Sequence, residues 1–153
     1  MDKVIVYTHS KYGLAVCIPA PDDRRPGEVE DAWLKRVSER SIPKDAKDVR
    51  VCSRNELPKD RTFRDAWVHR GGKIDVDMPK AREIHRHRIR KARAKLLRKL
   101  DQEQLIAMAK DDRAALQKIE SSKQALRDAP AHPSIDGAQS PDELKTAWPL
   151  PKT

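Results

Sequence analysis

The feature that most restricts the fold of this chain is a long stretch, from Lys80 to Asp128, that contains neither glycine nor proline. Because these two residues disfavour helix most strongly, a stretch that lacks both favours a continuous helical conformation. Pro79 stands immediately before it, where the first turn of a helix accepts proline. We therefore expect a basic helical arm or a helical hairpin over residues 79–128.

A stripe of mostly apolar residues follows one helical face of this stretch, at intervals of three and four. It comprises Ala81, His85, Ile89, Ala92, Leu96 and Leu100, and continues after a change of phase with Leu105, Ala109, Leu116, Ile119 and Leu126. Charged residues 110–112 interrupt it, so we favour two helices over one. Two helices would bury each other's stripe, whereas one long helix would need a partner chain.

The positive charge of the chain is concentrated in the same stretch. Residues 80–99 hold ten lysines and arginines against one acid, Glu83, and so account for the whole net charge of +9. On a helix these cations surround the axis, and no aromatic residue between Trp67 and Trp148 is available for stacking on a base. We favour an acidic protein surface, or contacts within an assembly, over nucleic acid and over a purely solvated face.

The residues before this stretch predict a small β-rich module with one helix over residues 1–78. Strands are expected at 3–8, 14–18, 48–53 and around Ile74 and Val76. The intervening residues 28–40 predict an amphipathic helix, whose apolar face is Val29, Ala32, Trp33 and Val37. The segment with Phe63, Ala66 and Trp67 is expected to be helical or irregular. The fold class is therefore α+β.

The last segment, residues 129–153, is rich in proline and ends in a short helix. Ser140 and Pro141 are typical of a helix start, and the helix should end before Trp148 and Pro149. Trp33 and Trp67 are expected to anchor local clusters, because a buried tryptophan removes a large apolar area from water. Trp148 either folds back onto the body of the protein or is presented to a partner.

The sequence contains no motif of catalysis or metal binding, such as GxSxG, HExxH, a glycine-rich phosphate loop or paired cysteines. His85 and His87 are two residues apart, which places them on different sides of a helix; we expect His85 at the core edge and His87 in solvent. Asp75 and Asp77 are interpreted as polar positions of an exposed strand, and Cys17 and Cys52 as reduced, half-buried thiols. We therefore expect no enzyme, no cofactor and no metal.

Three phrases of the sequence resemble a group of small proteins encoded by tailed bacteriophages and prophages: LPKDRTFRDAW (57–67), VDMPKAREIHRHRIRKAR (76–93) and KQALRDAPAHPSIDGAQSPDELKTAWP (123–149). The last phrase is also similar in layout to the ends of phage tail-fibre assembly and tail assembly chaperone proteins. The resemblance implies a role in building or decorating a tail, without chemistry of its own.

These observations predict a non-enzymatic phage tail accessory protein that binds a tail or tail-fibre polypeptide, with a homo-oligomer also possible. A nucleic-acid-binding factor that uses helix 80–99 is the alternative. No apolar run approaches the roughly 20 residues needed to span a membrane, so we expect a soluble protein in the host cytoplasm during assembly or in the virion tail. The expected partner-binding residues are Arg86, Arg90, Arg93, Ile89, Leu96, Leu100 and Trp148.

Overall fold

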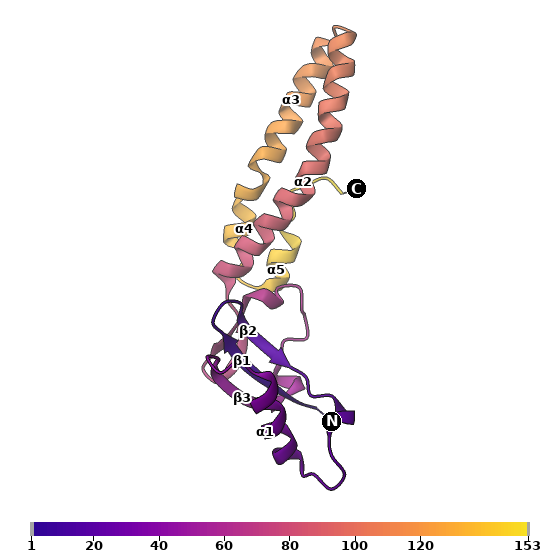
Figure 1. Cartoon of the computed structure of the whole chain (residues 1–153). Helices are drawn as coiled ribbons and strands as arrows, with labels where there is room; N and C mark the ends of the chain where they lie inside the picture. Colours follow the sequence, from indigo (N-terminus) through magenta and orange to yellow (C-terminus); the bar gives the residue numbers. More distant parts are fainter. Residues whose placement is uncertain (1, 153) are drawn as a thin grey trace. The chain divides into compact units, whose positions relative to one another are not determined.

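The computed structural model describes residues 2–152 and confirms the α+β class (Figure 1). The chain divides into two compact units, the first ending at Asp77 and the second beginning at Met78. We call them the N-terminal unit and the hairpin unit. The segment after residue 128, which the sequence predicts to be a separate part of the chain, belongs to the hairpin unit.

The N-terminal unit is built on a three-stranded antiparallel sheet of order β2-β1-β3. Its strands are β1 (Lys3–His9), β2 (Gly13–Cys17) and β3 (Lys47–Ser53), and helix α1 (Glu30–Ser41) connects β2 to β3. A second ladder pairs β4 (Trp67–Arg70) with β5 (Lys73–Val76). Short 3-10 turns complete the unit: η1 (Pro21–Asp23), η2 (Arg54–Glu56) and η3 (Arg64–Ala66).

Strand β1 has apolar residues at three successive positions, Val4, Ile5 and Val6. Because successive side chains of a strand point to opposite faces, both faces of the three-stranded sheet are apolar there. On one face Ile5 packs with Trp33, Leu34 and Val37 of α1. On the other, Trp67 belongs to a cluster with Val4, Val6, Cys52 and Ile74. Trp33 and Trp67 thus anchor local clusters, as predicted. Cys17 and Cys52 are free thiols, half-buried and buried respectively, and burial raises the pKa of each.

Two expectations for the N-terminal unit are wrong in part. Trp67 begins a strand instead of lying in a helix or an irregular segment, because Gly71 and Gly72 take positive φ values of 57° and 78° and close a tight hairpin. In α1, Val29 is the residue before the helix and is exposed, as is Ala32. The buried face of α1 is instead Trp33, Leu34 and Val37.

The hairpin unit consists of α2 (Met78–Ala109) and α3 (Arg113–Asp128), which lie side by side (Figure 1). The expected interruption of the stripe at residues 110–112 is the turn between them. Asp111 adopts a left-handed φ of 49°, and the Asp112 side chain accepts a hydrogen bond from the Ala115 N–H at 3.0 Å. Of the two arrangements considered, the structure has the hairpin.

The first part of the predicted stripe of α2 is buried, but the prediction is wrong near the turn. Ala81, His85 and Ile89 are buried, and Ile119 and Leu126 of α3 are buried as well. Leu105 and Ala109, however, are exposed, and Ala107 takes the buried position. The assumed change of phase is therefore wrong, because Ala107 lies a whole number of helical turns after Ile89, within the ideal periodicity.

The last helical elements of the chain pack against α2 (Figure 1). After α3 come η4 (Ala129–Ala131), α4 (Pro133–Gly137) and α5 (Pro141–Thr146), of which α4 has no counterpart in the sequence prediction. Ser140 caps α5 as predicted, accepting a hydrogen bond from the Glu143 N–H. Across residues 2–152, none of the helices has the length and apolar character that crossing a membrane requires.

Candidate protein-docking groove

Basic side chains of α2 hold the C-terminal segment in place by donating hydrogen bonds to backbone carbonyls. Arg82 donates to the carbonyl of Ala138 at 2.7 Å, and His85 Nε2 lies 2.8 Å from the carbonyl oxygen of Ala147. His85 is only 4% exposed, at the edge of the core as predicted, whereas His87 is exposed. Part of the basic sequence 80–99 therefore serves the packing of the unit itself.

The three arginines expected to meet a partner also have contacts inside the hairpin unit. Arg86 contacts Asp136 and Glu83, and Arg90 pairs with Glu83 at 2.9 Å. Arg93 donates to the carbonyl of Arg127, at 2.7 Å, near the end of α3, where carbonyls lack helical partners. That these arginines steer a partner stays a prediction. The acidic groups of such a partner would compete with these internal contacts.

A groove about 470 Å³ in volume lies between α2 and the last residues of the chain. Its apolar lining comes from Ala92 and Leu96 on α2 and from the C-terminal residues Trp148, Leu150 and Pro151. Its cationic lining is Arg88, Lys91 and Lys95, and no acidic residue lines it. The position of the groove follows from the carbonyl contacts just described, because these hold the segment around Trp148 against α2.

Lys91 and Lys95 distinguish this groove from the other basic positions of α2. Both are exposed, and neither forms an ion pair or hydrogen bond with any residue in the described range. They are four residues apart and therefore lie on the same side of the helix. An acidic group placed over Ala92 and Leu96 would meet two ammonium groups that no internal carboxylate neutralises.

Trp148 combines the two alternatives that the sequence left open. Its ring meets the His85 ring edge-on, with centroids 5.5 Å apart and an interplanar angle of 65°, so the side chain does fold back onto the body of its own unit. It nevertheless remains 39% exposed and lines the groove. The side chain is thus positioned by α2 and accessible to a ligand.

Among the predicted site residues, the structure brings Leu96 and Trp148 together at the groove. Ile89 is fully buried, and Leu100 is half-buried outside the groove lining. Sequence reasoning missed Lys91, Lys95 and Leu150. The four-residue spacing of the lysines was a signal for one helical side, but nothing in the sequence placed the C-terminal segment beside them.

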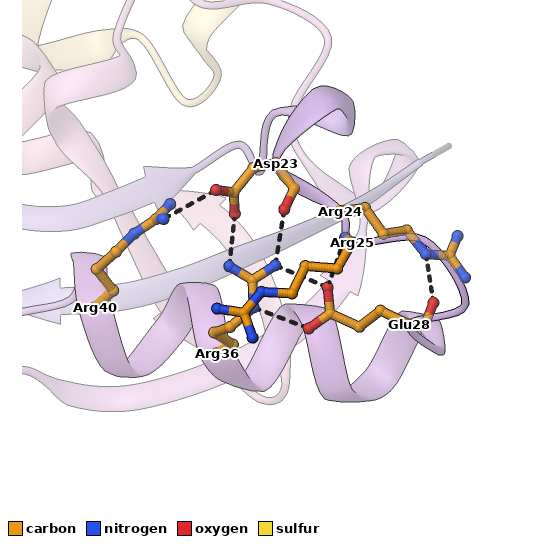
Figure 2. Close-up of polar contacts among 6 residues, drawn as sticks. All are labelled: Asp23, Arg24, Arg25, Glu28, Arg36 and Arg40. Atoms are coloured by element: carbon orange, nitrogen blue, oxygen red, sulfur yellow. Dashed lines mark hydrogen bonds and ion pairs between the residues drawn. The ribbon is translucent and has the colours of Figure 1, made fainter.

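A second polar cluster, in the N-terminal unit, has a structural role (Figure 2). Arg36 of α1 donates to Glu28 at 2.7 Å and to the backbone carbonyl of Asp23 at 2.7 Å, and Arg40 pairs with Asp23. The hydrogen bond from Arg36 and that from the Arg25 N–H lower the pKa of Glu28 to about 2. The proline-rich segment after β2 is thereby fastened to α1.

Comparison of the chain with protein-family models, with curated proteins and with solved structures gave no match. In the part of the chain that the structure describes, no group of three or more histidine, cysteine or acidic side chains is arranged to hold a metal ion. The candidate site therefore depends on its own geometry: an apolar groove beside Lys91 and Lys95, which no described carboxylate neutralises.

Proposed function

We propose that this protein is a non-enzymatic phage tail accessory protein, whose groove binds an acidic and partly apolar segment of a tail or tail-fibre polypeptide. It would act in the host cytoplasm as an assembly chaperone or remain in the virion tail. The observation that carries the proposal is the groove in which Lys91 and Lys95 flank Ala92, Leu96 and Trp148 without an internal acidic partner. The sequence resemblance supplies the class of partner.

The proposed binding has two physical components. The lysines attract an acidic segment from solution, which raises the rate of association and makes binding weaker at high salt. Once the segment is in place, apolar atoms of Leu96 and Trp148 leave water, at about 25 cal/mol per Å² of buried apolar surface. Tryptophan is one of the residue types that contribute most to the binding energy of such interfaces, so Trp148 is expected to contribute strongly here.

Co-expression with the tail or tail-fibre polypeptide encoded beside this gene tests the proposal. We expect a complex that survives gel filtration, and a tail polypeptide that is less soluble without it. The variant Lys91→Glu/Lys95→Glu should weaken the complex at least about tenfold, as expected for reversed charges facing an acidic segment. Arg113→Glu/Lys118→Glu is the matched control, because both side chains are exposed on α3, outside the groove.

Three results would contradict the proposal: a tail polypeptide equally soluble alone, no complex after gel filtration, or equal loss of binding in both charge-reversed variants. Filter binding of duplex and single-stranded oligonucleotides at about 50 mM salt tests the alternative. Retention that the Lys91→Glu/Lys95→Glu variant abolishes, together with no tail complex, would favour nucleic acid instead.

A further inference from the structure

A small pocket in the N-terminal unit carries positive charge that the proposed function does not use. Its volume is about 190 Å³, and it lies where the end of β2, the turn η2, residues 57–64 and the first residue of β4 meet. It is lined by Val16, Ile18, Arg54, Asn55, Leu57, Pro58, Lys59, Arg61, Arg64 and Trp67. No acidic residue is among them.

The four cationic side chains of this lining, Arg54, Lys59, Arg61 and Arg64, form no ion pair with any residue from 2 to 152. Three acids lie close to these cations in sequence, Glu56, Asp60 and Asp65, and none of them lines the pocket. Glu56 accepts from the Ser53 N–H at 2.8 Å and from Arg50 at 3.2 Å, and Asp60 accepts from the Thr62 N–H at 2.9 Å. The lining itself therefore carries four cationic side chains and no carboxylate.

Trp67 adds an independent observation that points to a ligand. The residue is only 2% exposed, and its indole Nε1 is buried without a hydrogen-bond acceptor among the described residues. A buried N–H that loses water and gains no acceptor destabilises the folded state. Trp67 lines the pocket, so an anionic oxygen that reaches its Nε1 atom would supply the acceptor that the protein does not.

The rest of the lining is apolar and partly open to solvent. Ile18 is 52% exposed although it is a large aliphatic residue, and Leu57 and Pro58 lie beside the cations. A bare inorganic ion would leave this surface in water. A ligand with a short organic group attached to its anion would cover it.

We propose that this pocket binds the phosphate group of a small phosphate monoester, with the organic part of the ligand against Ile18 and Leu57. Three arginines favour phosphate over a carboxylate, because each planar guanidinium matches two phosphate oxygens and a monoester carries up to two negative charges. The volume is below the roughly 300–1,000 Å³ typical of drug-sized ligands. The pocket thus suits one phosphate and a small substituent.

Isothermal titration of the full chain with phenyl phosphate, benzoate and inorganic phosphate tests this proposal. We expect phenyl phosphate to bind with an affinity that falls as salt is raised. Benzoate has the same ring but carries only one negative charge and fewer oxygen acceptors, so it should bind at least about tenfold more weakly. Inorganic phosphate lacks the apolar part and should bind more weakly than phenyl phosphate.

Two variants place the binding in this pocket. Arg61→Ala/Arg64→Ala should weaken phenyl phosphate binding at least about tenfold, whereas Lys35→Ala/Lys44→Ala removes the same charge elsewhere in the N-terminal unit and should leave it within about twofold. Trp67→Phe keeps an aromatic ring but removes the N–H, and should weaken binding several-fold. It also serves as the test if the double arginine variant does not fold.

Equal binding of phenyl phosphate and benzoate would overturn the proposal, as would no measurable heat at millimolar ligand or equal effects of the arginine and lysine variants. Tight binding of an oligonucleotide that Arg61→Ala/Arg64→Ala abolishes, with no binding of phenyl phosphate, would also overturn it and assign the pocket to a nucleic-acid backbone. These outcomes are independent of the groove, whose residues lie in the hairpin unit.

Discussion

The Nε2 atom of His85 lies 2.8 Å from the carbonyl oxygen of Ala147, 62 residues further along the chain. A carbonyl oxygen can only accept, so Nε2 carries a hydrogen atom and donates it. This contact holds Ala147, the residue before Trp148, against α2. The Trp148 ring then meets the His85 ring. One buried histidine thus positions both the end of α5 and the aromatic wall of the groove.

Replacing His85 with alanine should lower the free energy of unfolding of the hairpin unit by about 2–4 kcal/mol, because it leaves a cavity and a buried carbonyl without its donor. Urea unfolding followed by circular dichroism measures the loss, and Trp148 fluorescence should shift to the red as the ring gains solvent. His87→Ala, at an exposed position, should stay within about 0.5 kcal/mol of the wild type. Equal effects of the two substitutions would show that the carbonyl contact is not important.

Ile89 and Leu105 should respond very differently to truncation, although the sequence places both on one stripe. Ile89 is fully buried, so Ile89→Ala should destabilise the hairpin unit by about 2–5 kcal/mol. Leu105 is 67% exposed, so Leu105→Ala should change stability by less than about 0.5 kcal/mol. A large loss for Leu105→Ala in a monomer at low protein concentration would contradict the hairpin packing.

Lys123 is a buried cation of α3 that faces two polar groups of α2. Its Nζ lies 2.5 Å from an Asp101 carboxylate oxygen and 2.5 Å from the Gln104 side-chain oxygen. Asp101→Ala leaves the buried ammonium with one neutral acceptor and should destabilise by about 1–3 kcal/mol. Lys123→Met removes the charge itself, leaves Asp101 solvated, and should be within about 1 kcal/mol of neutral. Thermal unfolding of both variants checks this order, and the reverse order would contradict it.

Asp111 occupies a backbone conformation that glycine adopts without steric cost, with φ of 49° at the end of α2. Asp111→Gly should therefore raise the free energy of unfolding of the hairpin unit by about 0.5–1 kcal/mol, after the greater entropy of glycine in the unfolded chain is included. Asp111→Ala retains the Cβ and should give no such gain. Urea midpoints of the three proteins provide the comparison, in which a destabilised glycine variant would refute the prediction.

The carboxylate of Glu28 makes the N-terminal unit sensitive to acid. The pKa of Glu28 falls from 4.5 to about 2 on folding, chiefly through its hydrogen bond with Arg36. A lowered pKa in the folded state gives a contribution that is complete above about pH 4.5 and is lost as the pH falls through about 2. In a Trp148→Phe background, fluorescence of Trp33 and Trp67 should report this loss. Glu28→Gln should flatten the profile between these pH values, whereas Asp45→Asn, an exposed control, should leave it unchanged.

Local patterns were sufficient to predict the α+β class, α1, α5, four of the strands and the break between α2 and α3. Strand β4 was missed because Trp67 and Ala66 fit a helix as well as a strand, and only pairing with Val76 decides between them. The predicted stripe of α2 was wrong at Leu105 because a change of phase was assumed there, whereas Ala107, in phase with Ile89, takes the buried position. For β4 the deciding interaction is tertiary, and the local sequence does not encode it.

Of the residues that line the groove, Leu96 and Trp148 were predicted from the sequence as partner-binding residues, but neither of the two lysines was. The count of cations on α2 was correct, yet a count does not tell which of them donate to carbonyls. Arg93 and Lys91 are two residues apart; the first reaches the end of α3, and the second has no partner in the described residues. That difference arises from where the C-terminal segment returns to α2, which no spacing rule specifies.

The Lys123 ammonium also restricts how α2 and α3 can slide along each other. A displacement of α3 by one turn, about 5.4 Å, would take the Nζ atom away from both Asp101 and Gln104. The ammonium would then be inside the interface with no oxygen to receive its hydrogens. Alanine and leucine side chains tolerate such sliding far better, so this one polar contact selects a single alignment of the two helices, and with it the position from which the chain returns to form the groove.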